Sequence, residues 1–230
     1  MALPGGDAAV EHAVRTAWSL LVSAFGADEA ERHLTGRLAG TRPADRRLWA
    51  DLVAKGVSAP RACGLGRLFD GASALAGVCE RNTYEGQAAI ELEAAAGEAP
   101  DEAEPYGFAL LEAPAEGGGW VLDTRELVRE LVGDVERGRG VEEVSARFHA
   151  TCAAMLTAAA RRARGETGLE RVALSGGCFA NARLTRLVAA GLEADGFAVY
   201  GHRDVPPGDG CIALGQAYVA AARLSAEREE

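Results

Sequence analysis

Apolar side chains recur every three or four residues through much of the first hundred positions. One such stripe runs over 7–25, where Asp7 is placed to cap a helix and Gly26 to end it. The same spacing predicts further helices over about 28–38, 44–55, 66–77 and 86–96. Segment 97–105 is acidic and holds two prolines, so we expect a loop there. The first part of the chain is therefore predicted to be helical.

The pattern changes after residue 105. Two short apolar runs, 107–111 and 120–122, predict strands joined by the glycine-rich turn 116–119. Helices are then predicted over about 124–136 and 141–164. After them come a strand at 172–174, a helix that follows the Gly-Gly turn and ends near 190, a strand at 198–200 and a helix at 212–224. This alternation implies parallel strands with right-handed crossovers, and hence an α/β lobe behind the helical part. The glutamate-rich tail after Leu224 is expected to fray.

Composition narrows the class of protein. The chain of 230 residues is 48% hydrophobic and 25% charged, as soluble globular proteins are. Its 34 acidic residues against 24 Lys and Arg give a net charge of −10, so neither nucleic acid nor an anionic membrane is an expected partner. The 5 cysteines form no C-x-x-C pair, and neither a membrane-spanning apolar run nor a signal peptide is visible. We therefore expect a cytoplasmic protein.

The strongest local signal is the segment 174–181, LSGGCFAN. A strand that runs into Gly176 and Gly177 and then into a helix brings backbone N–H groups and the positive end of a helix dipole to one place. Glycines there allow a nucleotide to approach the backbone, and Asn181 could hydrogen-bond a base or a ribose. The alternative is a tight turn that needs positive φ, with Asn181 as an ordinary polar helix residue.

A second candidate follows the next predicted strand, at 205–215. Pro206 and Pro207 stiffen a loop that carries Asp209 to the start of the last helix, at the same end of the sheet as the first motif. The carboxylate could coordinate a metal ion, and the helix start favours its ionised form. The alternative is that Asp209 is the N-cap of that helix, and the spacing by itself favours the cap.

Two acidic side chains in the helical part form a third candidate. Asp70 ends the segment GRLFD, and Glu91 lies in the segment TYEGQAAIELE at 83–93. The two residues lie on helices that a loop folds back against each other, and carboxylates in such a place commonly hold the hydroxyl groups of a ribose. The alternative is a solvated helix surface, where most acidic residues lie.

Other residue types point to no site. The four histidines are widely separated and are expected on the surface or in packing: His12, His33, His149 and His202. The sequence contains neither a G-x-x-x-x-G-K-[ST] phosphate loop nor a G-x-S-x-G nucleophile motif. Cys178 and Cys211 lie beside the glycine turns without a histidine nearby in the sequence, so we expect packing residues rather than nucleophiles.

Taken together, these segments resemble a known family. LPGGDAA, GRLFD, YEGQAAIELE, LSGGCFAN and PPGDGCIALGQA follow the order of the C-terminal half of HypF-type carbamoyltransferases, which are maturation factors of nickel–iron hydrogenases. The resemblance covers nearly the whole chain and implies an α/β lobe of the actin-like ATPase superfamily, with a ribonuclease-H-like mixed sheet and flanking helices. Residues 1–100 would be its mainly helical part, contributing nucleotide-binding helices, and residues 101–230 its α/β core.

The resemblance also implies a reaction and its ligands. HypF-type proteins pass a carbamoyl group from carbamoyl-adenylate, made with ATP, to the C-terminal cysteine of the partner HypE, which dehydrates it towards the cyanide ligand. By similarity, Asp70 and Glu91 would hold the ribose, and Asn181 would face the base. Gly86 and Gln87 would line the nucleotide. None of these residues would be a nucleophile or a base, because the lobe supplies positioning.

By the same similarity, Asp209 would be one ligand of a divalent metal ion: iron, zinc or magnesium. The other ligands would be two histidines of a preceding lobe that this sequence does not contain, along with the further upstream HypF domains. We therefore expect an open, half-built site that closes against the other lobe. We also expect an exposed interlobe face that includes Trp18 or Trp49 and allows self-association.

Two further classes of function are open on the sequence. The first is an O-carbamoyltransferase of natural-product assembly or the related tRNA threonylcarbamoyl-transfer family. YEGQAAIELE and LPGGDAA favour the HypF type over both, and the acidic charge argues against tRNA. The second is a non-catalytic module that binds a nucleotide or docks a partner, which the missing histidine ligands favour.

Overall fold

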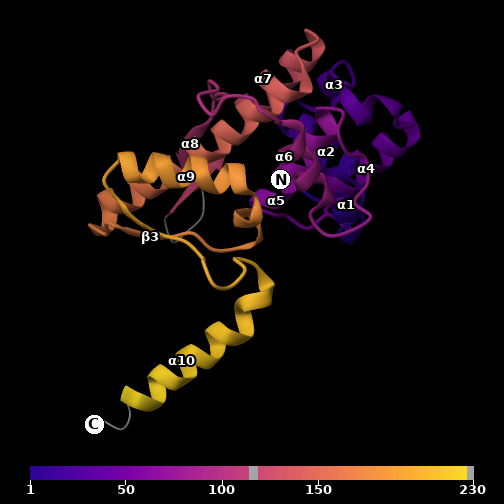
Figure 1. The fold of residues 1–230 in the computed structure, drawn as a ribbon. Helices are drawn as coiled ribbons and strands as arrows, with labels where there is room; N and C mark the ends of the chain where they lie inside the picture. Colours follow the sequence, from indigo (N-terminus) through magenta and orange to yellow (C-terminus); the bar gives the residue numbers. More distant parts are fainter. Residues whose placement is uncertain (114–118, 227–230) are drawn as a thin grey trace.

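The computed structural model describes residues 1–113 and 119–226. Its first hundred residues are helical, as the apolar spacing predicts (Figure 1). The helices are α1 (Asp7–Glu11), α2 (Ala13–Phe25), α3 (Ala27–Ala30), the 3₁₀ turn η1 (Gly36–Gly40), α4 (Pro43–Lys55), α5 (Leu65–Leu75) and α6 (Gln87–Ala95).

All four named strands of the described chain follow residue 100. They are β1 (Ala109–Glu112), β2 (Trp120–Asp123), β3 (Arg171–Ala173) and β4 (Ala198–Tyr200). The remaining elements are α7 (Arg125–Glu136), α8 (Val141–Thr167), η2 (Gly177–Ala180), α9 (Ala182–Ala194), η3 (Asp209–Cys211) and α10 (Ile212–Ala226). The expected hairpin turn lies mostly outside the described residues, as does the end of the glutamate-rich tail.

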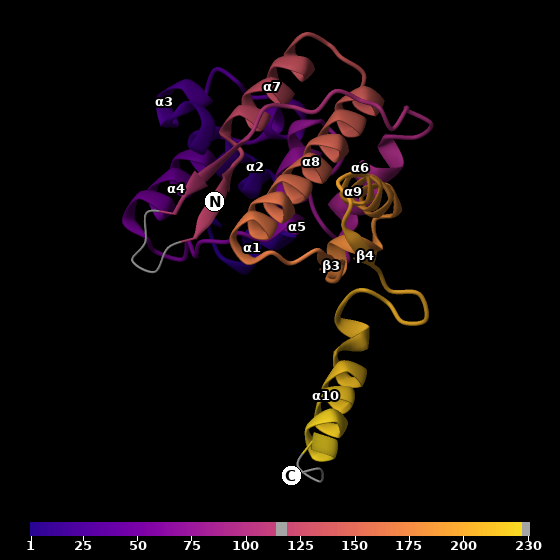
Figure 2. The same ribbon diagram turned by 90° about the vertical axis from the view of Figure 1, so that its left-hand side faces the viewer.

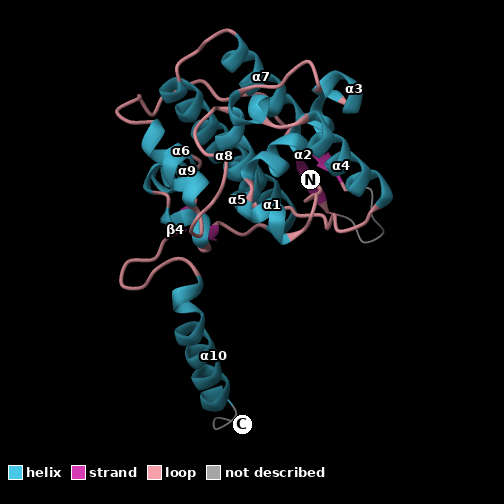
Figure 3. Cartoon of the chain, turned by 90° about the vertical axis from the view of Figure 1, so that its right-hand side faces the viewer, coloured by secondary structure: helices cyan, strands magenta, loops and turns pink. Residues whose placement is uncertain are grey.

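The strands pair in two separate two-stranded sheets (Figure 3). β1 and β2 are antiparallel, with Leu110 opposite Leu122. β3 and β4 are parallel, with Val172 opposite Val199, and α9 forms the crossover between them. The predicted parallel pairing is therefore confirmed. The described strands do not join into the mixed sheet that the resemblance implied, because the antiparallel pair and the parallel pair stay separate, and helices make up most of the rest of the described chain.

The centre of the molecule is a contact between α2 and α5. A side chain at Gly71 of α5 would collide with Leu20 of α2, so the absence of a Cβ allows the two helices to approach closely. Phe69 extends the core toward α8, where its ring meets Phe148 edge to face at 4.9 Å between centroids. This core joins the helical part to α7, α8 and α9 (Figure 2).

Two of the predicted helices differ from the structure. The stripe over 7–25 breaks at His12 into α1 and α2, and Gly6 rather than Asp7 precedes the first turn. The helix expected over 28–38 stops at Ala30. Gly36 instead adopts a φ of 53°, and a Cβ there would collide with the Leu75 carbonyl oxygen at the end of α5, so this close approach requires glycine.

The two tryptophans expected on an exposed face are buried, so that expectation is wrong. Trp18 is 3% exposed and Trp49 is 6% exposed. Each lies beside an arginine, Arg46 at 6.0 Å from the Trp18 ring and Arg15 at 5.6 Å from the Trp49 ring. Both tryptophans belong to the core that anchors α4 against α2.

The last helix stands away from the rest of the chain (Figures 1 and 2). None of the residues of α10 is buried, and apolar side chains such as Tyr218, at 77% exposure, face solvent. Within the described ranges, no helix has both the length and the apolar character needed to cross a membrane.

Candidate nucleotide-binding edge

The two glycine motifs meet at the carboxyl ends of β3 and β4. The Gly176 N–H donates to the carbonyl oxygen of Pro207 at 2.7 Å. Gly208 packs against Gly177, and a Cβ at position 208 would lie 3.5 Å from the Gly177 Cα. Gly176 has a φ of 108°, which side-chain-bearing residues rarely adopt. The glycines thus serve both the turn and the close contact between the motifs.

Asp209 lies on the same edge and is exposed, as the first residue of η3. Gly208 is the N-cap of η3, and α10 begins three residues after Asp209, at Ile212. Across the described ranges, no group of three or more His, Cys, Asp or Glu side chains is arranged to hold a metal ion. Asp209 therefore offers a single carboxylate, and these residues alone do not form a metal site.

Asn181 is buried and fully engaged. Its Oδ1 accepts from the Leu184 N–H at 2.7 Å, which caps α9. Its Nδ2 lies 3.0 Å from Nε2 of His149, whose Nδ1 lies 2.8 Å from the Ser145 carbonyl oxygen. Burial lowers the pKa of His149 to about 4, so the ring is neutral and accepts from the amide. Asn181 thus holds the glycine turn onto α8, and its contact with a base remains a prediction.

Asp70 is buried rather than presented at the surface. Its side chain is 1% exposed, and its Oδ2 lies 2.7 Å from Nη1 of Arg67. Asn82 Nδ2 donates to the other carboxylate oxygen at 3.3 Å. Burial raises the pKa of Asp70 to about 6, against the opposing effects of Arg67 and of the Asn82 hydrogen bond. In this conformation the Asp70 carboxylate is covered and is not accessible to a ligand.

The segment 80–86 covers Asp70 and is itself tied to α1. Arg81 pairs with Glu11, and the Asn82 side-chain amide donates to the Val10 carbonyl oxygen at 2.8 Å. The Asn82 Oδ1 accepts from the Ala88 N–H at 2.8 Å, at the start of α6. These contacts join GRLFD and YEGQAAIELE to the two residues that directly follow LPGGDAA.

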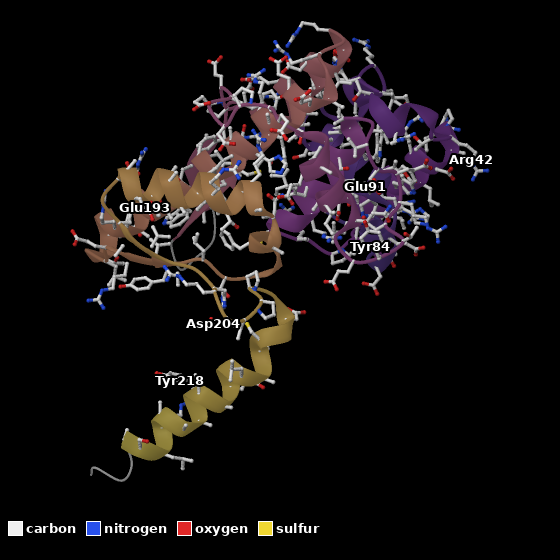
Figure 4. The ribbon with its side chains drawn as sticks, in the orientation of Figure 1. Arg42, Tyr84, Glu91, Glu193, Asp204 and Tyr218 are labelled. Carbon is white, nitrogen blue, oxygen red and sulfur yellow. The ribbon has the colours of Figure 1, made fainter. Side chains whose placement is uncertain are left out.

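Glu91 and Gln87 lie on one side of α6, and Figure 4 labels Glu91 and Tyr84 on the helical part of the molecule. Gln87 Nε2 donates to Glu91 Oε1 at 2.6 Å. Gln87 Oε1 accepts from the Thr83 N–H at 2.7 Å. Gly86 precedes the helix with a φ of 76°, which turns the chain into α6. Both polar side chains are half-buried, so each keeps a surface open to a ligand.

The helical candidates adjoin the glycine edge. A Cβ at Gly66, near the start of α5, would lie 3.9 Å from the Cys178 Sγ. A Glu93 carboxylate oxygen of α6 accepts from the Arg183 N–H at 3.1 Å. Burial raises the pKa of the Cys178 thiol, which favours the protonated form and suits a packing residue. The three candidate regions therefore adjoin one another in the fold.

Two cavities of the described chain lie away from this edge. One cavity of about 550 Å³ lies between 99–104 and 139–147. Another, of about 790 Å³, lies between 61–65, the β1–β2 hairpin and α8. Neither is lined by any of the predicted site residues, which are Asp70, Gly86, Gln87, Glu91, Gly176, Gly177, Asn181 and Asp209. Ligand enclosure would require a further surface against this edge.

Sequence reasoning missed one polar pair at the same edge. Ser175 Oγ lies 3.0 Å from Nε2 of His202, which was expected to be a surface or packing residue. A signal for the pair exists in the sequence, because Ser175 directly follows the predicted strand 172–174 and His202 is the second residue after the predicted strand 198–200. Carboxyl ends of neighbouring parallel strands lie together.

Comparison with known proteins identifies the family. Residues 1–216 match the family described as "Carbamoyltransferase, Kae1-like Domain, second subdomain". The chain belongs to this family. This Kae1-like subdomain is 35% identical to carbamoyltransferase HypF2 of Cupriavidus necator over 96% of its own length and 29% of the relative's. It is 37% identical to carbamoyltransferase HypF of Rhodobacter capsulatus, over 96% and 27% of the two chains.

Two solved HypF structures share the fold of this chain. The subdomain superposes with a TM-score of 0.82 and 30% identity on a crystal structure of full-length HypF in the phosphate- and nucleotide-bound form, covering 95% of this chain and 33% of that one. The crystal structure of T. kodakarensis HypF gives a TM-score of 0.79 at 26% identity. The predicted actin-like ATPase type of α/β fold is confirmed. The Kae1-like subdomain spans less than a third of the length of HypF2 and of the R. capsulatus HypF.

Proposed function

We propose that this chain is the C-terminal lobe of a carbamoyltransferase of hydrogenase maturation. It would help to move a carbamoyl group from carbamoyl-adenylate to the C-terminal cysteine of a HypE-like protein. The observation that carries the proposal is the match of residues 1–216 to the second subdomain of Kae1-like carbamoyltransferases. The contacts that join the segments GRLFD, YEGQAAIELE, LSGGCFAN and PPGDGCIALGQA support it, as does the nucleotide bound by the HypF relative of TM-score 0.82.

The lobe contributes binding and orientation. Gly176 and Gly177 present exposed backbone on which the nucleotide rests, and Gln87 and Glu91 offer an amide and a carboxylate beside it. The partner's thiolate attacks the carbamoyl carbon of the mixed anhydride, a new C–S bond forms, and the bond to the phosphate oxygen breaks to release AMP. Holding these reactants in line can contribute roughly 7–11 kcal/mol to catalysis.

Asp70 requires a local rearrangement before it can hold a ribose. Segment 80–86 would swing from α1, breaking the Arg81–Glu11 pair and the contact between Asn82 and Val10. Exposure would relieve the desolvation that raises the pKa of Asp70 and would leave an ionised carboxylate for the ribose hydroxyls. Binding of the nucleotide and opening of this segment are therefore coupled in our proposal.

In this proposal, Asp209 is the part of the metal site that this chain supplies, and the other ligands belong to an upstream lobe. Asp209 supplies one oxygen ligand at the edge, and a divalent ion would need its other ligands from an upstream lobe. Such an ion, when bound, neutralises charge on the phosphate and carbamoyl oxygens. The shorter coverage of the relatives agrees with this division, because more than two thirds of HypF2 lies outside the match.

Titration calorimetry tests the nucleotide site. ATP with Mg²⁺ is titrated into the wild-type chain, into Glu91→Gln and into the matched control Glu193→Gln, which lies on the exposed face of α9 (Figure 4). We expect Glu91→Gln to weaken binding about tenfold, since a hydrogen bond to a charged group contributes about 1.5–3 kcal/mol, and the control to bind normally. Equal binding by all three would remove Glu91 from the site.

A chimera tests the reaction itself. In C. necator HypF2, this chain replaces the matching segment, and transfer to a HypE C-terminal peptide is followed as the mass gain of one carbamoyl group. Asp209→Ala in the chimera is expected to abolish transfer while carbamoyl-adenylate still forms. Loss of both steps would contradict the division of labour proposed here. An active adenylate-forming chimera that never transfers, even with Asp209 intact, would favour a non-catalytic nucleotide-binding module.

A further inference from the structure

A serine and a histidine leave the two parallel strands side by side. β3 and β4 end at the register partners Ala173 and Tyr200. The ladder continues beyond them, because the Leu174 N–H donates to the Tyr200 carbonyl oxygen at 2.8 Å. Ser175 and His202 are each the second residue after their strand, and Ser175 Oγ lies 3.0 Å from His202 Nε2. The pairing is thus set by the strand register.

The serine hydroxyl has no strong acceptor of its own in this structure. Its Oγ lies 3.5 Å from the carbonyl oxygen of Pro207, at the limit of a hydrogen bond. That carbonyl already accepts the Gly176 N–H at 2.7 Å. If His202 Nε2 carries a hydrogen and donates to Oγ, the hydroxyl hydrogen of Ser175 is left for an incoming oxygen.

Packing does not explain the pair. Ser175 and His202 are both exposed, and a hydrogen bond between exposed side chains adds little to stability because water replaces it readily. The position is instead the one where open parallel sheets bind ligands, outside the carboxyl ends of the strands. It also adjoins the exposed backbone of Gly176 and Gly177.

We propose that Ser175 contacts the phosphate of the nucleotide and that His202 is its positioning residue. The Ser175 hydroxyl donates to a phosphate oxygen, and the His202 imidazole orients that hydroxyl by donating to Oγ. The inference rests on the proposed nucleotide site. It adds that the phosphate is the part of the nucleotide that contacts this edge. No bond to the protein forms or breaks, so both residues act by binding.

Titration of AMP and of adenosine into the 230-residue chain tests the inference. We expect Ser175→Ala and His202→Ala each to bind AMP about tenfold more weakly, since one hydrogen bond to a charged oxygen is lost or misaligned. Adenosine, which has no phosphate, should bind all variants alike. His202→Gln keeps an N–H donor within reach of Oγ and should retain most of the AMP affinity. The double variant should be no weaker than Ser175→Ala.

The controls are Ser225→Ala on α10 and His33→Ala, beside Glu136 and away from the edge. Both should bind AMP as the wild type does, and thermal unfolding verifies that every variant is folded. Equal weakening of AMP and adenosine would show a structural role and overturn the inference. So would unchanged AMP affinity in Ser175→Ala and His202→Ala. A wild-type chain that binds neither ligand would instead refute the proposed nucleotide site itself.

Discussion

The Asp70 carboxyl illustrates how a single residue can differ from its sequence-based interpretation. An acidic residue on an amphipathic helix is expected at a solvated surface or at a ligand. Here it is buried under segment 80–86, paired with Arg67 and hydrogen-bonded to Asn82. Desolvation exceeds these favourable contacts, so the pKa of Asp70 rises from 3.8 to about 6.

This shift predicts a pH dependence of stability. Between pH 3.8 and about 6 the folded chain keeps a proton on Asp70 that the unfolded chain has released. The folded state therefore binds more protons, and its stability falls as pH rises through this window, by about 3 kcal/mol in total for a shift of this size. Above about pH 6, Asp70 is ionised in both the folded and the unfolded chain, so it causes no further change in stability. Asp70→Asn cannot ionise and should lack this fall.

Urea unfolding of wild type and Asp70→Asn at several pH values measures the effect. The informative quantity is the difference between the two proteins, because His149 acts in the opposite direction: its lowered pKa of about 4 makes the fold lose stability as pH falls. Asp51→Asn, an exposed carboxylate of α4, serves as the control. Parallel pH profiles for wild type and Asp70→Asn would disprove the buried, protonated state.

At the scale of elements, the glycine turn is held in place by the start of α9. Asn181 caps that helix through Oδ1 and reaches α8 through Nδ2, where His149 accepts. The ring of His149 also meets Phe69 of α5 at 5.3 Å. Asn181 therefore connects the turn that carries Gly176 and Gly177 directly to α8 and, through His149, to α5.

Removal of that side chain should destabilise the fold measurably. Asn181→Ala loses the cap and leaves the buried Nε2 of His149 without a donor, which together cost about 3 kcal/mol. Asn181→Ser keeps a capping oxygen and loses only the amide donor, so about half of that loss is expected. Free energies of unfolding from urea titrations compare the three proteins. A loss below about 0.5 kcal/mol in Asn181→Ala would mean that the cap and the His149 contact do not anchor the turn.

At the scale of the whole molecule, α10 is distinct from the rest of the fold. Its residues bury no surface in the core, whereas α2, α5 and α8 each contribute several fully buried side chains. We propose that the predicted self-association uses this apolar helix as its surface in place of the buried tryptophans. Sedimentation of the chain over a range of concentrations tests it.

Deletion of residues 212–230 should leave the remainder folded and about as stable. Because no side chain of α10 is buried, the expected change in the free energy of unfolding is within about 0.5 kcal/mol. Urea unfolding of the truncated and complete chains measures this difference. Deletion of α9 residues 182–194, which bury Leu184, Val188 and Leu192, is the contrasting case and should abolish folding. A large loss on removing α10 would show that it packs on the fold in solution.

Patterns along the chain were enough to predict most of the elements and to place the two glycine motifs together. Local patterns of apolar spacing and glycine turns predicted most helices, the parallel β3–β4 pair and the meeting of the two glycine motifs, since these depend on contacts close along the chain or on strand direction. Tertiary structure decided what each polar side chain faces. The burial of Asp70, Trp18 and Trp49 arises from contacts between residues on different elements. Periodicity cannot specify such contacts, because they depend on which helix or loop covers a given face.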